Sequence, residues 1–225
     1  MTKPRALLSW SSGKDSAWTL HVLRQQGAYE IAGLLTTVNQ SAGRVAMHAV
    51  REQLLEAQAA AAGLPLWRVP IPSPCSNEQY EAAMRQVLER ARTAHIAAVA
   101  FGDLFLEDVR RYREERMAEA GLRLLFPLWQ QPTPALARQM IAGGVRAVLT
   151  CVDPKQLAPR FAGREFTLDL LGDLPASVDP CGENGEFHSF VFAGPMFQED
   201  IRVNVGEIVE RDGFVFADVL PAEAR

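Results

Sequence analysis

The stretch LLSWSSGKDSAWTLHVL, residues 7–23, passes from apolar residues through a cluster of small polar residues into an amphipathic segment. The pattern predicts a buried strand at residues 5–10 and a helix at residues 15–26, which Gly27 ends. A glycine-bearing loop between a first strand and its helix lies at the carboxyl edge of a parallel sheet, where α/β folds bind ligands. The stretch therefore predicts a fold class and a ligand site together.

Strand and helix patterns alternate outward from this stretch. Apolar, β-branched runs at residues 31–38, 66–70 and 97–103 predict strands, and helix patterns at residues 46–62 and 77–94 separate them. This alternation with short connections indicates right-handed βαβ units. We expect an α/β protein with a parallel sheet and helices on both faces of that sheet.

The alternating pattern breaks where three prolines fall within residues 127–134, and we place a domain boundary near residue 130. Residues 1–130 are then the ligand-binding domain, and residues 131–225 are a smaller α+β domain. The smaller domain is expected to end in a hairpin with an Asp-Gly turn at residues 212–213.

The composition is that of a globular protein, since 48% of the 225 residues are hydrophobic and 22% are charged. No apolar run approaches the roughly 20 residues of a membrane helix, and the N-terminus MTKPRALLSW lacks the longer apolar stretch of a signal peptide. The three cysteines form no CxxC pair and indicate reduced thiols. We therefore expect a cytoplasmic protein with no membrane partner. The net charge of -4 provides no overall basic field for nucleic acid.

The polar loop has the groups of an anion site. Its backbone N–H groups and the helix N-terminus would hold phosphate, and the hydroxyls of Ser11, Ser12 and Ser16 add donors. Lys14 would supply a positive charge, and Asp15 is expected to bind magnesium, because a bare carboxylate would repel phosphate. The Walker A pattern is not met, since Asp15 stands at its Ser/Thr position. A serine N-cap before an ordinary helix is the alternative.

A second polar stretch, GDLFLEDVRRYRE at residues 102–114, follows an expected strand and places Gly102 and Asp103 at the same sheet edge. Asp103 is a candidate metal ligand, with a helix cap or turn residue as the alternative. Arg113 is a candidate phosphate or substrate clamp, with a solvated, glutamate-laced face as the alternative. His48 could reach the same edge or could be structural.

The third stretch is DPCGENGEFHSFVFAGPMF at residues 179–197, a glycine-bearing loop that leads into an apolar run. Its carboxylates Glu183 and Glu186 and the imidazole of His188 are candidates for recognition of a substrate by hydrogen bonds or charge. Cys181 and His188 are too few ligands to make a zinc site a strong alternative. A nucleophilic Cys181 would also need a base that the sequence does not place.

SSGKDS resembles the SGGxDS pyrophosphate loop, or PP-loop, of the N-type ATP pyrophosphatases, which cleave ATP between its α and β phosphates. Ser12 stands where the common pattern has its second glycine, so a positive φ there would strain the backbone. Together with GDLFLEDVRRYRE and GENGEFHSFV, the loop resembles the bacterial branch of the diphthine-ammonia ligase family over nearly the whole chain.

The resemblance implies a Rossmann-like ATP domain of the HUP type and a smaller C-terminal domain. It implies ATP and Mg²⁺ as cofactors, adenylation of a carboxylate and attack by free ammonia. The carboxylate would belong to a small molecule or to a modified protein side chain, and the resemblance also suggests a homodimer. Family members that act on diphthine read E-G-G-E-[FY]-E-T, whereas this chain reads ENGEFHS at residues 183–189, so His188 replaces an acidic residue. The acceptor therefore stays open.

The resemblance also implies roles for the residues that match the family motifs. The expected catalytic residues are Lys14, Asp15, Glu183 and Glu186. The expected nucleotide contacts are Ser9, Ser11, Ser12, Gly13, Lys14, Asp15, Ser16, Thr36, Gly102 and Asp103. The expected substrate contacts are His48, Arg113, Asn184, Gly185, Glu186 and His188. Magnesium would bind Asp15 and Asp103.

Two other functions stay open beside an amide-forming ligase. One is adenylation of RNA or another oxygen acceptor, against which the missing CxxC pair and the acidic net charge count. The other is a sensor that binds ATP without turnover. The ligase would produce AMP and pyrophosphate, whereas the sensor would leave ATP intact.

Overall fold

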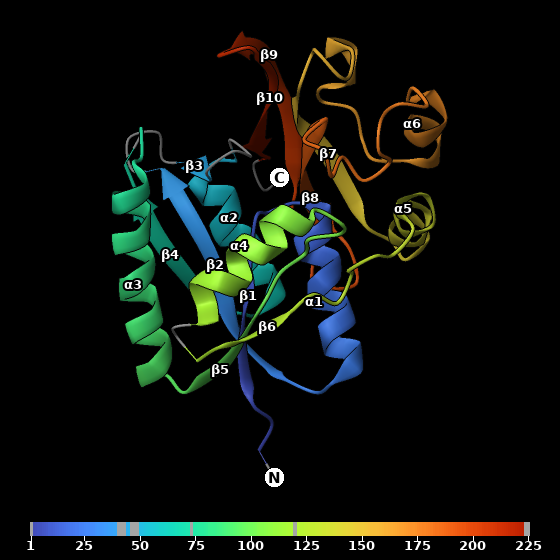
Figure 1. Cartoon of the computed structure of the whole chain (residues 1–225). Coiled ribbons are helices and arrows are strands. Elements are labelled where there is room, and N and C mark those ends of the chain that lie inside the picture. Colours follow the sequence, from blue (N-terminus) through green and yellow to red (C-terminus); the bar gives the residue numbers. More distant parts are fainter. Residues whose placement is uncertain (1, 40–43, 46–49, 73, 119–120, 223–225) are drawn as a thin grey trace.

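The computed structural model describes residues 2–39, 44–45, 50–72, 74–118 and 121–222. The N-terminal part of this described chain forms six strands, namely β1 (Arg5–Ser9), β2 (Glu30–Asn39), β3 (Arg44–Val45), β4 (Leu66–Ile71), β5 (Ile96–Ala100) and β6 (Arg123–Leu125). They form one sheet in the order β3-β2-β1-β5-β6, and β4 also pairs with β2 (Figure 1). Only the pair of β2 with β3 is antiparallel among these described pairings.

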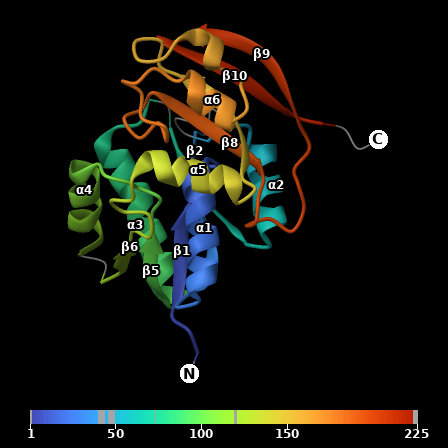
Figure 2. The same ribbon diagram turned by 90° about the vertical axis from the view of Figure 1, so that its right-hand side faces the viewer.

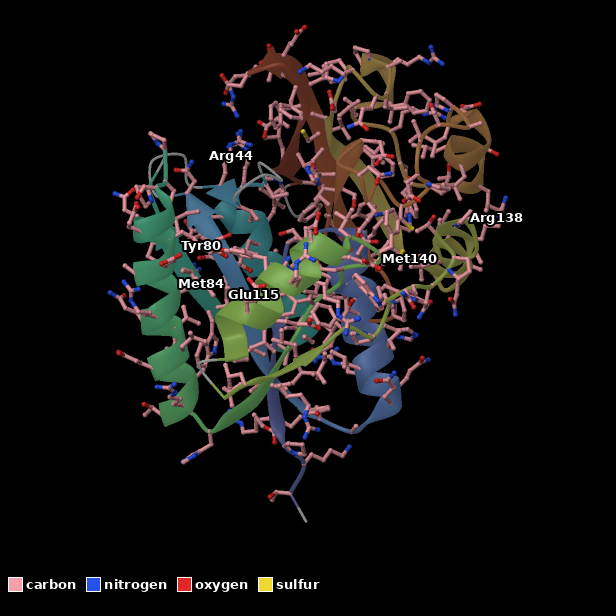
Figure 3. The ribbon with its side chains drawn as sticks, in the orientation of Figure 1. Arg44, Tyr80, Met84, Glu115, Arg138 and Met140 are labelled. Atoms are coloured by element: carbon pink, nitrogen blue, oxygen red, sulfur yellow. The ribbon has the colours of Figure 1, made fainter. Side chains whose placement is uncertain are left out.

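Helices cover both faces of this sheet, as the sequence predicts. They are α1 (Lys14–Gln26), α2 (Glu52–Ala62), α3 (Asn77–Thr93) and α4 (Glu107–Ala118). Figure 2 shows α1 and α2 on one side of the sheet and α3 and α4 on the other. Figure 3 shows Tyr80 and Met84 on α3, where they pack against the apolar core of that face.

Alternation along the strands separates the two cores. Leu7 and Leu35 pack into the core beneath α3, whereas their neighbours Leu8 and Leu34 pack into the core beneath α1 and α2. Successive side chains of a strand point to opposite faces, so a strand buried on both faces reads as a continuous apolar run. This explains why these strands show no hydrophobic alternation in the sequence.

The C-terminal part forms a second, antiparallel sheet from β7 (Arg146–Val152), β8 (Phe187–Ala193), β9 (Val203–Arg211) and β10 (Phe214–Pro221). The strand order is β8-β7-β10-β9, and the β9–β10 turn has positive φ at both Asp212 and Gly213, as expected for the hairpin. The remaining elements are α5 (Thr133–Ala142), the 3₁₀ turn η1 (Pro159–Phe161) and α6 (Leu168–Asp173). No helix in the described ranges is both long and apolar enough to cross a membrane.

One apolar core continues from the first sheet into the second. It contains Leu20 of α1, Leu55 of α2, Met140 of α5 and Val148 of β7. The predicted helix at residues 46–62 is described as α2 from Glu52 onward, and its predicted residues 46–49 lie outside the described part of the chain. The apolar run within the third polar stretch lies in β8, which contributes to the site described below.

Candidate active site

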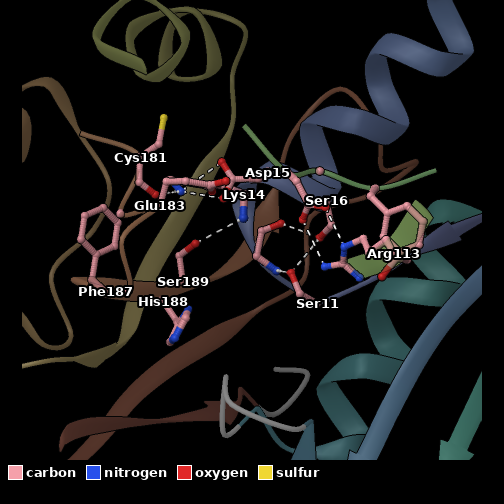
Figure 4. Close-up of a pocket in the computed structure, with 17 residues that line it drawn as sticks. Ser11, Lys14, Asp15, Ser16, Arg113, Cys181, Glu183, Phe187, His188 and Ser189 are labelled. Atoms are coloured by element: carbon pink, nitrogen blue, oxygen red, sulfur yellow. Dashed lines mark hydrogen bonds and ion pairs between the residues drawn. The ribbon is translucent and has the colours of Figure 1, made fainter. Parts of the chain in front are cut away.

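A pocket opens where the carboxyl ends of β1 and β5 meet the N-terminus of α1 and strand β8 (Figure 4). Its lining comes from the three polar stretches that the sequence singles out and from Phe101, which directly precedes the second of them. The lining residues are Ser9, Ser11, Gly13, Lys14, Asp15, Ser16, Phe101, Gly102, Asp103, Arg113, Cys181, Gly182, Glu183, Gly185, Phe187, His188 and Ser189. Most of the predicted nucleotide and substrate contacts therefore meet in one cavity.

The backbone of Ser12 adopts the strained conformation that the sequence suggests. Its φ is 71°, in the left-handed region, and its side chain is fully buried rather than lining the pocket. A left-handed conformation costs a residue with a Cβ about 1–2 kcal/mol. The carbonyl of Ser12 accepts hydrogen bonds from the N–H of Val191 at 3.0 Å and from Nε2 of Gln58 at 3.0 Å. Contacts from β8 and α2 thus hold the loop in this shape.

The N-terminus of α1 does not have the ordinary serine cap that was the alternative for this loop. Gly13 is the N-cap and provides no side-chain hydrogen bond. The N–H of Lys14 donates instead to Oγ of Ser189 in β8 at 3.2 Å. The hydroxyl of Ser16 donates to the carbonyl of Gly13 at 2.9 Å and lies 3.2 Å from the hydroxyl of Ser11. The helix start is therefore assembled from its own loop and from the C-terminal sheet.

The side chain of Lys14 is buried and points to the third polar stretch. Its Nζ donates to Oδ2 of Asp15 at 2.8 Å and to the carbonyl of Cys181, and it lies 5.4 Å from the ring centroid of Phe187. Burial alone would lower the pKa of the Lys14 ammonium, but the acidic groups around it, with the carboxylate of Asp15 foremost, together outweigh burial and raise that pKa above its ordinary value. Lys14 is therefore a charged link between the first loop and the C-terminal part.

Asp103 and Arg113 form a bidentate ion pair on the opposite wall. Nε of Arg113 lies 2.7 Å from Oδ2 of Asp103, and Nη2 of Arg113 lies 3.1 Å from Oδ1 of Asp103. The guanidinium also lies 4.3 Å from the ring centroid of Phe101. Arg113 therefore faces the pocket, which does not fit the alternative of a solvated helix face.

The two glutamates of the third stretch have different surroundings. Glu183 lines the pocket, and its Oε1 accepts a hydrogen bond from the N–H of Leu104 at 2.7 Å. Burial raises the pKa of Glu183 to about 7, against the opposing effect of that N–H. Glu186 is buried outside the pocket lining, where it accepts bonds from the N–H of Asp179 at 2.8 Å and of Asn184 at 2.9 Å. Glu183 can therefore meet a ligand, whereas Glu186 fixes the shape of the loop.

Cys181 is buried, and His188 is partly buried at the pocket wall. Burial, with a smaller contribution from the charge of Lys14, lowers the pKa of His188 to about 4, so its imidazole is neutral at pH 7. Burial also raises the pKa of the Cys181 thiol above its ordinary value, which disfavours a nucleophilic thiolate. The described residues contain no group of three His, Cys, Asp or Glu side chains arranged to hold a metal, so the zinc alternative has no support from them.

Two more expected contacts lie outside the pocket lining, as Ser12 and Glu186 do. Thr36 is buried and its hydroxyl donates to the carbonyl of Trp10 at 2.8 Å, so it supports the first loop from behind the pocket lining. Asn184 lies outside the lining, although its neighbour Gly185 belongs to it. His48 falls outside the described residues.

Sequence reasoning missed several residues of the lining. Phe187 and Ser189 belong to the third stretch and Phe101 directly precedes the second, but apolar or small residues beside charged ones give no signal of a role. Gln58 holds the loop from α2 and belongs to no polar stretch, so only its fully buried amide, visible in the structure, reveals it.

Comparison with known proteins shows matches along most of the chain. The family model for the diphthamide synthase N-terminal domain matches residues 4–124, and the model for the diphthamide synthase C-terminal domain matches residues 133–218. An alignment of length 187 with a diphthine–ammonia ligase of Danio rerio has 29% identity and covers 76% of this chain and 72% of the relative. An alignment of length 233 with that of Mus musculus has 27% identity and covers 93% of this chain and 86% of the relative.

Among solved structures, a predicted subunit of a tRNA methyltransferase from Methanocaldococcus jannaschii aligns with a TM-score of 0.44 and 14% identity. The alignment covers 88% of this chain and 100% of that chain.

Proposed function

The chain belongs to the diphthamide synthase family, and from this premise we propose that it is an AMP-forming ligase that joins ammonia to a carboxylate. Relatives named diphthine–ammonia ligase support an ATP-dependent ligase. One observation carries the proposal furthest: the SSGKDS loop and the ENGEFHS loop share one pocket. Transfer of AMP to an acceptor needs both substrates in contact, and a shared pocket provides that proximity.

The first loop is the proposed site for the phosphates of ATP. Asp15 and Ser16 line the pocket in the first turn of α1, where backbone N–H groups have no partner within the helix. Such N–H groups and the helix dipole favour an anion, and they would stabilise pyrophosphate as its charge develops. The hydroxyl of Ser11, which also lines the pocket, adds a donor.

The charges of the pocket favour a divalent cation with ATP. Among the described lining residues, the cations Lys14 and Arg113 are each paired with a carboxylate, of Asp15 and Asp103 respectively. Glu183 adds a third carboxylate to the lining. A triphosphate would therefore meet little net positive charge. Carboxylate oxygens suit Mg²⁺, so Asp15 and Asp103 would hold the ion, which would neutralise phosphate charge.

The third stretch is the proposed acceptor side. With a pKa of about 7, Glu183 is suited to take a proton from the attacking amine near neutral pH. His188, neutral at pH 7, can donate or accept a hydrogen bond with the acceptor but offers no negative charge. A quaternary ammonium group, such as that of diphthine, favours acidic or aromatic surroundings. For this chain we therefore propose the type of reaction. We define its acceptor more broadly than diphthine, as a molecule that carries a carboxylate.

Product analysis tests the proposal. ATP labelled at its α phosphate is incubated with Mg²⁺, ammonium and a pool of small molecules from a cell extract. We expect labelled AMP that depends on the extract and disappears in Asp15→Asn. Asp108→Asn is the matched control, because Asp108 also pairs with an arginine but lies on the exposed side of α4. Labelled ADP, or ATP that stays intact with every acceptor pool, would contradict the proposal.

A further inference from the structure

Gln58 is a fully buried polar residue near the end of α2, far in sequence from every motif of the pocket. Its Oε1 accepts a hydrogen bond from Nε1 of Trp10 at 2.9 Å. Its Nε2 donates to the carbonyl of Ser12 at 3.0 Å and to the carbonyl of Val191 at 2.7 Å. Both protons of the amide nitrogen and one lone pair of the oxygen are thus used, which compensates for burial of the amide.

The groups that Gln58 holds flank the first loop. Trp10 and Ser12 stand on either side of Ser11, which lines the pocket. Ser12 has a φ of 71°, and a strained backbone persists only where its surroundings determine it strongly. Gln58 and the N–H of Val191 meet at the same Ser12 carbonyl, which therefore receives two hydrogen bonds.

The same amide also reaches the strand that forms the acceptor side. Val191 belongs to β8, which carries His188 and Ser189 into the pocket. Ser189 in turn accepts the hydrogen bond from the N–H of Lys14. Two hydrogen bonds therefore join the loop to β8, one from Val191 to Ser12 and one from Lys14 to Ser189. Gln58 binds both residues of the first pair.

We propose that Gln58 is a positioning residue, which holds the first loop in its phosphate-binding shape and fixes it to β8. The inference rests on the proposed assignment of this loop to ATP. The described hydrogen bonds of Gln58 reach Trp10, Ser12 and Val191, none of which lines the pocket, so Gln58 acts through these groups rather than on a ligand. Its loss should loosen the loop and weaken ATP binding.

The test compares two variants of α2. Gln58→Met keeps the length of the side chain and removes its three hydrogen bonds, so we expect the Kd of Mg-ATP, measured by calorimetry, to rise about tenfold. The amide of Val191 should exchange its hydrogen faster than in the wild type. Leu55→Ala is the control, because Leu55 is fully buried in the same helix and its truncation leaves a cavity without removing a hydrogen bond. It should lower the melting temperature but leave ATP affinity unchanged.

Two results for ATP affinity would overturn the proposal. One is an unchanged Kd in Gln58→Met, and the other is ATP binding that weakens in both variants in proportion to the loss of melting temperature. If Gln58→Met does not fold, Trp10→Phe removes one of the bonds to the amide and should weaken ATP binding more than Leu55→Ala does. A wild type that binds no ATP would contradict the proposed function, whereas unchanged exchange at Val191 in Gln58→Met would contradict the role of Gln58.

Discussion

The backbone N–H of Lys14 donates a hydrogen bond of 3.2 Å to the hydroxyl of Ser189, although 175 positions separate the two residues. The first turn of α1 is thereby completed by a side chain from the C-terminal sheet. This bond joins the proposed nucleotide loop to the proposed acceptor side, so we expect a substitution on one side to alter the structure of the other.

Ser189→Ala should destabilise the protein, because the buried N–H of Lys14 loses its acceptor. Such a loss costs about 1–3 kcal/mol of unfolding free energy, which urea denaturation can measure. Thr150→Val is the matched control, since the Thr150 hydroxyl is buried in the same sheet without a hydrogen-bond partner among the described residues. Equal losses in the two variants would show that the bond to Lys14 contributes nothing.

Ser12→Gly should stabilise the protein, because glycine adopts a φ of 71° without the penalty of a Cβ. The variant also removes a buried hydroxyl that has no partner among the described residues. We expect a gain of about 1 kcal/mol in unfolding free energy. Ser12→Ala keeps the Cβ and removes only the hydroxyl, so the difference between the variants measures the strain. A destabilised Ser12→Gly would contradict this account.

Gly102→Ala should disrupt the start of α1. A Cβ on Gly102 would lie 2.9 Å from the carbonyl carbon of Asp15 and 3.0 Å from the nitrogen of Ser16, both of them backbone atoms. The helix start must move, so we expect ATP binding measured by calorimetry to weaken by at least about tenfold. Gly172→Ala in α6 is the control, because a Cβ there meets nothing within 4 Å. Wild-type affinity in Gly102→Ala would show that the helix start does not contact the nucleotide.

Turnover should rise with pH through an inflection near 7, where Glu183 loses its proton and becomes the base that the proposed reaction needs. Rates are compared at a constant concentration of free ammonia, since its protonation also varies with pH. Glu183→Gln should lower turnover and abolish the inflection. An inflection that persists in this variant would assign it to another group.

The same pKa has a consequence for stability. Burial raises the pKa of the Glu183 carboxyl group in the folded protein above its ordinary value. The group is therefore most favourable to folding at a pH low enough to protonate it in both the folded and the unfolded state. Its contribution falls as the pH rises from its ordinary pKa toward 7. The melting temperature of Glu183→Gln relative to that of the wild type should therefore be higher at pH 8 than at pH 4, as thermal unfolding can measure.

Local patterns were enough to predict much of the fold. The helix that ends at Gly27, which has a φ of 62°, and the turn at Asp212 and Gly213 each depend on a few neighbouring residues. The alternation of strands and helices also led to the parallel sheet with helices on both faces. These features follow from periodicity and turn chemistry, which a sequence displays directly.

The finer arrangement of the site depends on contacts that the sequence does not display. Glu183 and Glu186 look alike in the sequence, yet the N–H groups of Asp179 and Asn184 draw Glu186 into the loop and leave Glu183 at the pocket. The contact of Lys14 with phosphate stays a prediction, but the sequence does not reveal that its Nζ lies between Asp15 and the carbonyl of Cys181. Tertiary contacts, rather than residue type, separate these roles.

The apolar core that runs through both sheets makes the N-terminal part, the proposed nucleotide-binding half, a poor candidate for transfer to another protein as a module. A chain cut near residue 130 would expose the surface where Trp18 of α1 meets Gly143 at the end of α5. It would also lose the Val191 N–H that secures the carbonyl of Ser12. The whole chain should therefore melt in one cooperative transition, in which the first loop and the C-terminal sheet unfold together.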